Sequence, residues 1–339
     1  MVTHDEFLNP FLHQSLKSEA YKVFSLAGDA SNRRYYRVVH DQHSYVLMRW
    51  ESFDPKNYPF LSVLNHFHKN GIHVPEVVNM SPGEGLVLLE DLGDLTLERR
   101  FWETQQTDGS LEFYKMAVDE LIKIHFKATA DKTDCTAFKI QFDTEKLLWE
   151  MNYGKDNLLA GVLKFNFTDS LQKEINEVFV DICTKLHEEP KFIAHRDYHS
   201  RNLMIKLDKM NVIDFQDARL GPIQYDLVSL FKDSYVDMSD EMVSQLTDYY
   251  LDLAKPNLGQ NFSREHFDYI YELQSIQRCF KACGSFASFY NLRQDRRYLK
   301  YLSHTLRKVI KSVTVFPEYK VFADILIDSG ALEKKYETL

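Results

Sequence analysis

Apolar and polar residues alternate in short runs over residues 20–90, which is the pattern of half-buried β-strands. The runs that combine this alternation with many Val, Tyr and Leu residues are Tyr21–Ala27, Arg34–Val39, Ser44–Trp50, Val74–Met80 and Leu86–Leu89. The turn-forming segments GDASN and HDQH separate the first three runs, so we expect these to pair as an antiparallel meander. Helical spacing predicts one helix at Phe7–Ser18 and another at Tyr58–Asn70, which Gly71 ends.

Beyond Leu95 the apolar residues recur at the three- and four-residue intervals of amphipathic helices. The helical segments that this spacing predicts are Leu111–Thr129, Thr144–Leu163, Ser170–His187 and a region from Tyr225 to about Ile310. Two strand-like runs, Leu203–Lys206 and Asn211–Phe215, flank an LDKM turn, and the final EKKYETL is expected to be a solvated tail. We therefore predict an α+β fold with a small antiparallel β-rich lobe over residues 1–92 and a larger, mainly α-helical lobe over residues 93–339.

The composition narrows the class of protein. Hydrophobic residues make up 44% of the 339 positions and aromatic residues 14%, which is enough for a sizeable core and argues against disorder. Lys and Arg total 41 against 50 Asp and Glu, a formal net charge of −9, so we expect no nucleic-acid partner, because such binding neutralises phosphates. No apolar run approaches the roughly 18 residues that cross a bilayer. Without a signal-peptide pattern or a CxxC pair, we expect a cytoplasmic protein with reduced cysteines and no membrane partner.

The densest group of chemically active residues lies between residues 192 and 231. The triplet HRD ends at Asp197, four residues separate it from Asn202, and Asp214 follows twelve residues later, beyond the expected hairpin. A carboxylate, a carboxamide and a second carboxylate on loops beside a hairpin suit phosphoryl transfer. Asp197 would accept or orient the proton of an attacking hydroxyl, whereas Asn202 and Asp214 would supply the hard oxygen ligands that Mg²⁺ requires.

Two other interpretations of these residues remain open. His195 and His199, with Asp197 between them, could form a zinc site, because both residue types are common zinc ligands. Zinc would, however, leave Asn202 and Asp214 unexplained. Asp197 could instead merely cap a helix, although the spacing of the two halves of the motif argues against coincidence.

The pattern HRDxxxxN…DF resembles the catalytic and metal loops of the protein-kinase-like superfamily. The segment IDFQDARLGPIQYDL lacks the DFG glycine and the APE segment, which is similar to the small-molecule branch, the aminoglycoside phosphotransferase and choline kinase group. Four segments are similar to the bacterial anomeric kinases of N-acetylmuramate and N-acetylglucosamine: GDASNRRYYRV, LVLLEDLGD, HRDYHSRNLMI with VIDFQDARLGPIQYDLVSLF, and IQRCFKACGSFASF. The resemblance covers nearly the whole chain.

This resemblance implies a bilobal protein-kinase-like fold with ATP between the lobes as co-substrate, Mg²⁺ on Asn202 and Asp214, and Asp197 as the catalytic residue. It also implies an amino-sugar acceptor that is phosphorylated at its anomeric hydroxyl in peptidoglycan recycling. Two alternatives stay open. The acceptor could be another small molecule with a hydroxyl group, such as an aminoglycoside, choline or a different sugar, or the chain could be a nucleotide-binding regulator without turnover.

The resemblance places the nucleotide loop between the first two strands. The loop residues whose backbone N–H groups and side chains would cover the phosphates are Gly28, Asp29, Ser31 and Asn32. Arg33 and Arg34 follow on the next strand, where alternation sends one of them inward, toward a phosphate. Backbone groups from Glu90 to Leu92, in the expected connection between the lobes, would bind the adenine edge.

Kinase-like enzymes carry on the third strand a Lys that holds the α- and β-phosphates, paired with a Glu on the next helix. In YVLMRW the equivalent position falls at Met48 or Arg49, and the helix predicted at Tyr58–Asn70 contains no Glu or Asp. Both halves of the ion pair are therefore missing together. We expect Arg49, Arg33 or Arg34 to contact the phosphates instead.

Three further charged residues have expected positions in the helical lobe. The resemblance places Arg278 near the acceptor, where its planar guanidinium would bind a carboxylate or a phosphate, unless it forms a structural ion pair. Asp217, three residues after Asp214, would touch metal, substrate or backbone. Asp226, in QYDL, is expected to fix a loop or cap a helix rather than take part in the chemistry.

Overall fold

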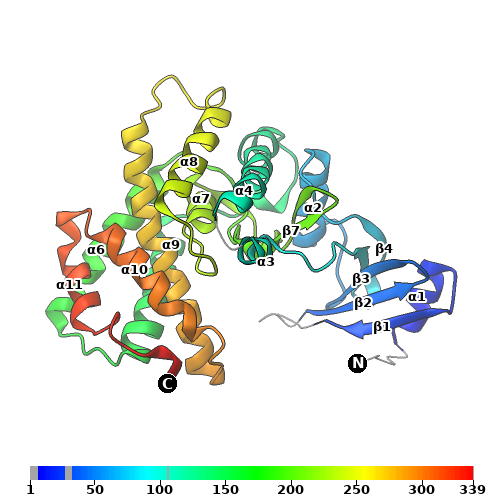
Figure 1. Ribbon diagram of the computed structural model, residues 1–339, viewed down its shortest axis with the longest axis horizontal. Coiled ribbons are helices and arrows are strands. Elements are labelled where there is room, and N and C mark those ends of the chain that lie inside the picture. Colours follow the sequence, from blue (N-terminus) through cyan, green and yellow to red (C-terminus); the bar gives the residue numbers. More distant parts are fainter. Residues whose placement is uncertain (1–6, 27–32, 105–106, 339) are drawn as a thin grey trace.

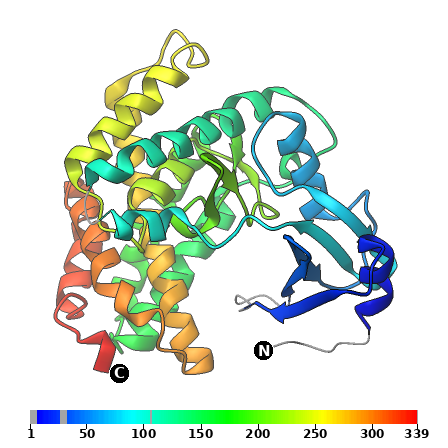
Figure 2. The same ribbon diagram turned by 45° about the vertical axis from the view of Figure 1, so that its right-hand side comes forward.

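The structure is a computed structural model that describes residues 7–26, 33–104 and 107–338, arranged as two lobes (Figure 1 and Figure 2). The N-terminal lobe contains an antiparallel sheet with the strand order β1-β2-β3-β5-β4. Its elements are α1 (Asn9–Leu16), β1 (Tyr21–Ser25), β2 (Arg34–His40), β3 (His43–Arg49), α2 (Pro59–Lys69), β4 (Val77–Ser81) and β5 (Leu86–Glu90). The predicted meander and both predicted helices are confirmed, with ends that differ by a few residues.

The two faces of this sheet pack against different partners, because successive side chains of a strand point to opposite sides. On one face Tyr36 and Leu47 form a small core with Leu12 of α1. On the other face Met48 and Val87 belong to the large core that continues through the helical lobe. This second face therefore looks toward the helical lobe, and the boundary that we predict at residue 92 lies just after β5, in the connection between the lobes.

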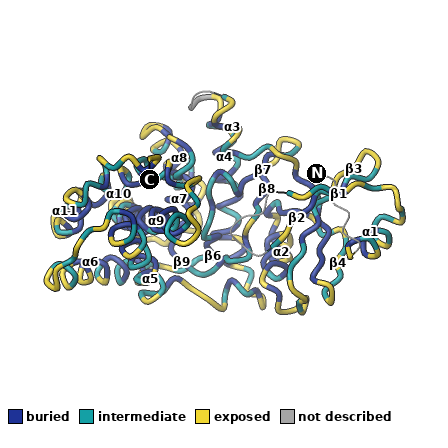
Figure 3. Tube along the Cα trace, turned by 90° about the horizontal axis from the view of Figure 1, so that it is seen from below, coloured by how far each residue is buried: buried dark blue, intermediate teal, exposed yellow. Residues whose placement is uncertain are grey.

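The C-terminal lobe is mainly helical. Its helices are α3 (Leu97–Glu103), α4 (Thr107–Ile122), α5 (Thr144–Gly154), α6 (Asp169–Glu188), α7 (Gln224–Phe231), α8 (Asp240–Ala254), α9 (Arg264–Arg293), α10 (Leu302–Val313) and α11 (Lys320–Asp328). α4 and α5 continue in wider π-helical turns, Lys123–Ala128 and Lys155–Val162. α9 is buried over most of its length (Figure 3). The two-lobe α+β architecture is confirmed, and in the described part of the chain no helix is long and apolar enough to span a bilayer.

Two short antiparallel ladders lie in the helical lobe, next to the connection between the lobes (Figure 2). β6 (Phe192–Ala194) pairs with β9 (Arg219–Gly221), and β7 (Leu203–Lys206) pairs with β8 (Lys209–Val212). The sequence predicts the β7–β8 hairpin but neither β6 nor β9, because three residues are too few to show an alternation.

The position of β8 corrects the predicted strand Asn211–Phe215. β8 begins earlier because Leu207 and Asp208 alone form the turn, with left-handed φ angles of 49° and 56°, as in the tight two-residue turns of hairpins. It ends earlier because the chain leaves the ladder at Val212, and Asp214 adopts a left-handed φ of 64°. Asp214 therefore lies on a loop rather than in a strand.

The C-terminal residues also correct a prediction, because they are not a solvated tail. The side chain of Tyr336 is only 2% exposed, and its hydroxyl donates a hydrogen bond to the carbonyl of Ala331 at 2.7 Å. The charged residues around Tyr336 make this segment look solvent-exposed in the sequence. Burial of the large Tyr336 ring nevertheless stabilises its packing against the rest of the lobe. The predicted helical region from Tyr225 to about Ile310 is divided into α7, α8, α9 and most of α10.

α5 and α9 approach closely where Gly154 faces Gly284. A Cβ atom added to Gly284 would lie 2.5 Å from the Cα of Gly154, which is backbone and cannot rotate away. We expect Gly284→Ala to push the helices apart and to lower the free energy of unfolding by about 1–3 kcal/mol in urea denaturation. The control is Gly259→Ala, an exposed position where the added Cβ meets no atom within 4 Å. An equal loss in both variants would contradict the close-contact explanation.

Candidate active site

The loop of residues 195–202, which follows β6, is anchored by Asp226 in the first turn of α7. The fully buried carboxylate of Asp226 accepts hydrogen bonds from the backbone N–H groups of His195 at 2.6 Å and Arg196 at 3.0 Å. Arg196 has a left-handed φ of 84°, a conformation that bulky residues rarely adopt. Asp226 thus stabilises a strained bend just before Asp197, which confirms that it fixes a loop.

Asn202 connects the two carboxylates that flank it in the sequence. Its side-chain amide donates a hydrogen bond to the backbone carbonyl of Asp197 at 2.9 Å and lies 3.3 Å from Oδ2 of Asp214. The amide of Gln216 donates to the other carboxylate oxygen of Asp214 at 2.7 Å. The structure therefore brings Asp197, Asn202 and Asp214 together at one place.

The chemistry of Asn202 and Asp214 fits Mg²⁺. Their side-chain oxygens are hard donors, and Mg²⁺ in nucleotide sites is held by one or two such groups together with phosphates and water. A zinc site at His195 has no such support, because its Nε2 lies 3.0 Å from the carbonyl oxygen of Ile213. Among the described residues, no group of three or more His, Cys, Asp or Glu side chains is placed to hold a metal ion.

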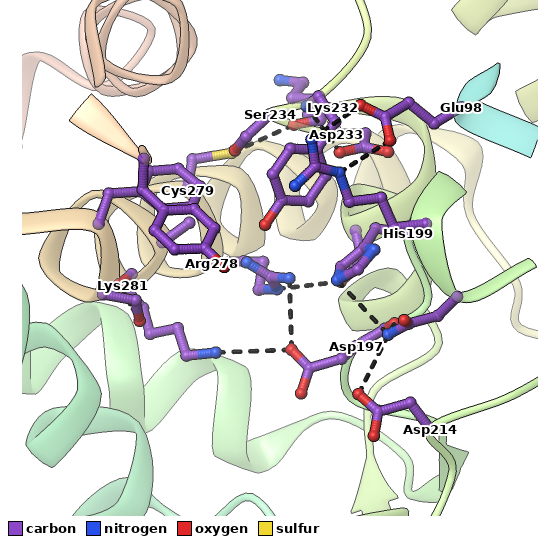
Figure 4. A pocket seen from close by; sticks show the side chains of 18 of the residues that line it. Glu98, Asp197, His199, Asp214, Lys232, Asp233, Ser234, Arg278, Cys279 and Lys281 are labelled. Atoms are coloured by element: carbon purple, nitrogen blue, oxygen red, sulfur yellow. Dashed lines mark hydrogen bonds and ion pairs between the residues drawn. The ribbon is translucent and has the colours of Figure 1, made fainter. Parts of the chain in front are cut away.

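Asp197 is surrounded by positive charge. Oδ1 lies 3.6 Å from the guanidinium of Arg278 and 3.6 Å from the ammonium of Lys281, and Oδ2 lies 4.0 Å from Nε of Arg196 (Figure 4). Burial alone would raise the pKa of this carboxyl group, but the three cations outweigh burial and hold the pKa far below its usual range. Burial lowers the pKa of nearby His199 to about 4, so that its imidazole is neutral at pH 7.

Two cavities meet at this group of residues. The interlobe cavity, of about 280 Å³, lies between the sheet, the connection between the lobes and the 203–216 segment. The helical-lobe cavity, of about 500 Å³, is formed by the start of α3, the 195–202 loop, α7 and α9 (Figure 4). Asn202, Ile213 and Asp214 line both cavities, whereas Asp197 lines the helical-lobe cavity. The shared residues therefore mark the junction of the two cavities.

The interlobe cavity contains the predicted connection residues. Glu90 and Leu92 both line it. Lys206 of β7 donates to Oε1 of Glu90 at 2.6 Å, so the helical lobe holds this end of the connection. Arg37 of β2, which the sequence analysis did not single out, also lines the cavity, and its guanidinium pairs with Asp91 at 2.6 Å. Tyr35 and Arg37 are two residues apart on a strand and therefore share one face of the sheet, which is the sequence signal that could have identified Arg37.

The predicted phosphate contacts are only partly described by the structure. Gly28, Asp29, Ser31 and Asn32 lie outside the described residues. The guanidinium of Arg33 covers the ring of Trp50 at 5.5 Å, and the exposed Arg34 is the ladder partner of Arg49. Arg49 itself packs over the ring of Phe7 at 4.5 Å. None of these three arginines is among the described residues that line the interlobe cavity.

The position of the third-strand Lys is occupied by apolar residues. Val46 lines the interlobe cavity, and Met48, two residues further on the same face of β3, is fully buried. Arg49 alternates to the opposite face, on the side of α1. Within the described residues, β3 therefore brings no cation to the face of the sheet that lines the interlobe cavity.

The two predicted substrate residues differ in their positions. Arg278 lines the helical-lobe cavity, where its Nε donates to the hydroxyl of Ser229 at 3.0 Å. Asp217 lines neither cavity; its half-exposed carboxylate pairs with Arg196 at 2.8 Å. Lys281 was not predicted from the sequence, although its spacing of three residues from Arg278 places both on one helix face.

Aromatic rings form one wall of the helical-lobe cavity. Phe289 and Tyr298 stack with centroids 4.6 Å apart, and Tyr235 and Phe286 lie beside them. The sequence alone does not show which aromatic residues gather here, because α9 and the segment after it meet only in the folded chain. Such a wall, opposite charged groups, is typical of a pocket for a polar molecule with an apolar face.

The chain is similar to known proteins along most of its length. The chain is 29% identical over 312 residues to the N-acetylmuramate/N-acetylglucosamine kinase of Neisseria meningitidis serogroup B, covering 89% of this chain and 90% of the relative. It is 28% identical over 298 residues to the protein of the same name from Pseudomonas putida, covering 87% and 85%.

Solved structures share the fold, including its protein-kinase-like division into two lobes. The gentamicin complex of the aminoglycoside phosphotransferase APH(2")-IIa has a TM-score of 0.59 at 16% identity, covering 95% of this chain and 99% of that chain. The choline kinase LicA from Streptococcus pneumoniae has a TM-score of 0.56 at 12% identity, covering 91% and 97%. The phosphotransferase enzyme family matches residues 23–260, well over half of the sequence. The chain therefore belongs to the phosphotransferase enzyme family.

Proposed function

We propose that this phosphotransferase is an ATP-dependent kinase of an N-acetylated amino sugar, with the anomeric hydroxyl of N-acetylmuramate or N-acetylglucosamine as acceptor. The observation that carries the proposal is the meeting of the interlobe and helical-lobe cavities at Asn202, Ile213 and Asp214. ATP would occupy the interlobe cavity, and the sugar would occupy the helical-lobe cavity. The names of the relatives, which match along most of both chains, support the choice of acceptor.

The chain's own residues divide the work between the two substrates. Backbone groups from Glu90 to Leu92 would bind the adenine base, since this segment lines the interlobe cavity. Asn202 and Asp214 would hold Mg²⁺, which supplies neutralising charge for the phosphates. Asp197, which lines the helical-lobe cavity next to the junction, would bind the acceptor hydroxyl and take its proton.

The electrostatics of Asp197 suit this acceptor. Its lowered pKa keeps the carboxylate charged at any physiological pH but makes it a weak base. In phosphoryl transfer the nucleophile is positioned more than it is deprotonated in advance, so a weak, well-placed base is sufficient. An anomeric hydroxyl is more acidic than an ordinary alcohol, and this further reduces the demand on Asp197.

The described lining of the helical-lobe cavity holds four acidic and four basic side chains, so it is the end beside Asp197, with its two cations, that disfavours cationic acceptors. Arg278 and Lys281 both approach Asp197, and both line the cavity. An aminoglycoside or choline would bring its own positive charge next to them, and the like charges would repel. A neutral or acidic N-acetylated sugar has no such conflict.

Phosphate transfer from Mg-ATP to a panel of acceptors tests the proposed function. The panel holds N-acetylmuramate, N-acetylglucosamine, glucose, choline and kanamycin, and phosphorus NMR identifies the hydroxyl that is phosphorylated. We expect turnover with an N-acetylated sugar and a product with the phosphate on its anomeric oxygen. Transfer only to choline or kanamycin would refute the proposed acceptor, and phosphate on another hydroxyl of the sugar would refute the anomeric assignment.

A further inference from the structure

The described part of the N-terminal lobe brings little positive charge to the nucleotide side of the site. Arg37 is the one cation among the described residues that line the interlobe cavity. Its guanidinium already pairs with Asp91 at 2.6 Å and with Asp94 at 2.9 Å. Kinase-like enzymes carry a Lys on the third strand for the phosphates, but here Met48 is apolar and buried.

Positive charge is concentrated instead on α9, across the site. Arg278 is 8% exposed and the Lys281 side chain 13% exposed, and both point at the same oxygen of Asp197 (Figure 4). With Arg196 on the other oxygen, three cations surround one carboxylate. Because Asp217 pairs with Arg196 at 2.8 Å, Arg278 and Lys281 are the two cations that face the carboxylate that would hold the acceptor hydroxyl.

Lys281 in particular is left without a close acceptor. Within the described chain its ammonium has no hydrogen bond, and its nearest ionic partner is Asp197 at 3.6 Å, too long for a hydrogen bond. The Lys281 side chain is 13% exposed and lines the helical-lobe cavity, so a bound ligand can supply the acceptor that the chain does not. Burial and the neighbouring Arg278 accordingly lower the pKa of Lys281, against the attraction of Asp197.

We propose that Lys281 is a further catalytic residue, which contacts the γ-phosphoryl group during transfer and brings positive charge to the site from α9, where β3 brings none. Arg278, fixed by the hydroxyl of Ser229, would assist it from the same helix face. An oxygen held by Oδ1 of Asp197 at hydrogen-bond distance lies at most about 6.5 Å from both cations, so an attached phosphoryl group is in reach of a long side chain. This inference rests on the proposed function, because it requires a nucleoside triphosphate as donor.

The proposed step balances without another reactant. A bond forms between the acceptor oxygen and the γ-phosphorus, while the bond from that phosphorus to the oxygen that remains on ADP breaks. The hydroxyl proton passes to Asp197 and then to solvent. The phosphoryl oxygens would approach Lys281 only as the group moves from ADP to the acceptor. The contact between Lys281 and these oxygens should therefore act on kcat rather than on substrate affinity.

Lys281→Met in the full chain tests this role with two acceptors, one anionic and one neutral. We expect kcat to fall by about 10²–10³ with N-acetylmuramate and with N-acetylglucosamine alike. The KM values for ATP and for each sugar should stay within about threefold, because little ground-state binding is lost. A KM that rises for N-acetylmuramate alone would overturn the proposal, since Lys281 would then bind the acceptor's carboxylate.

Rescue separates a chemical role from a structural one. In Lys281→Ala, added ethylammonium should restore part of kcat, and Lys281→Arg should retain more activity than Lys281→Met. The control is Lys311→Met on α10, an exposed Lys that pairs with Asp240, and it should keep the wild-type kcat. Absence of rescue in a folded variant would overturn the proposal.

The two proposals fail in different measurements. If the wild type phosphorylates only another acceptor of the panel, the amino-sugar assignment fails. The Lys281 variants are then compared with that acceptor, and an unchanged kcat would overturn the role of Lys281 alone.

Discussion

Asp197→Asn should lower kcat by about 10²–10⁴ while ATP binding remains. A fall of about 10² is the smallest rate contribution expected of one positioned acid or base. A fall of about 10⁴ would also include the loss of orientation of the attacking hydroxyl. Asn keeps the size of the side chain but removes the negative charge that faces Lys281 and Arg278. The measurement is kcat with the best acceptor, together with the dissociation constant of ATP from a fluorescence or calorimetric titration.

The matched control is Asp208→Asn, an exposed carboxylate in the β7–β8 turn, which should keep both values within about twofold. Asn also tolerates the left-handed backbone at that position, where φ is 56°. Phosphate transfer that survives in Asp197→Asn at the wild-type rate would refute the assignment of Asp197. Loss of ATP binding in the same variant would instead indicate a misfolded 195–202 loop.

The architecture was largely predictable because it depends on local periodicity. Alternation in β2 and β3 and helical spacing in α6 each persist long enough to be recognised against neighbouring sequence. β6 and β9 are invisible to this reasoning, since their three-residue ladder exists only through pairing at a distance. Tyr336 shows the same limit: nothing near it in the sequence indicates that its ring reaches a buried site.

The candidate site was predictable where its residues follow each other along the chain. Asp197, Asn202 and Asp214 lie on one loop-and-hairpin unit, so their spacing carries the information that brings them together. Charges that come from other elements have no spacing relative to Asp197 that would indicate the contact. Lys281 arrives from α9 and Arg37 from β2, and their proximity to the site follows from the packing of the lobes.

The second large effect should come from substitution of Asp226, which lines neither cavity. Its carboxylate is fully buried, and it binds the N–H groups of His195 and Arg196, with His125 Nε2 at 3.4 Å. Asp226→Asn has nearly the same shape, but it removes the charge and turns an NH₂ group toward a donor. We expect the free energy of unfolding to fall by about 3 kcal/mol, because charge-assisted hydrogen bonds are lost and a buried donor is left unpaired.

Urea denaturation measures this loss, and Asp252→Asn, an exposed carboxylate on α8, is the control that should change by less than about 0.5 kcal/mol. Activity gives an independent readout, because Asp226 holds the strained backbone of Arg196, whose φ is 84°. Without that anchor the bend should relax, and Asp197, the next residue, should lose its position even in molecules that remain folded. We therefore expect kcat to fall together with stability. Full kcat in a destabilised Asp226→Asn would show that the bend is maintained by other contacts, such as that between His195 and the carbonyl of Ile213.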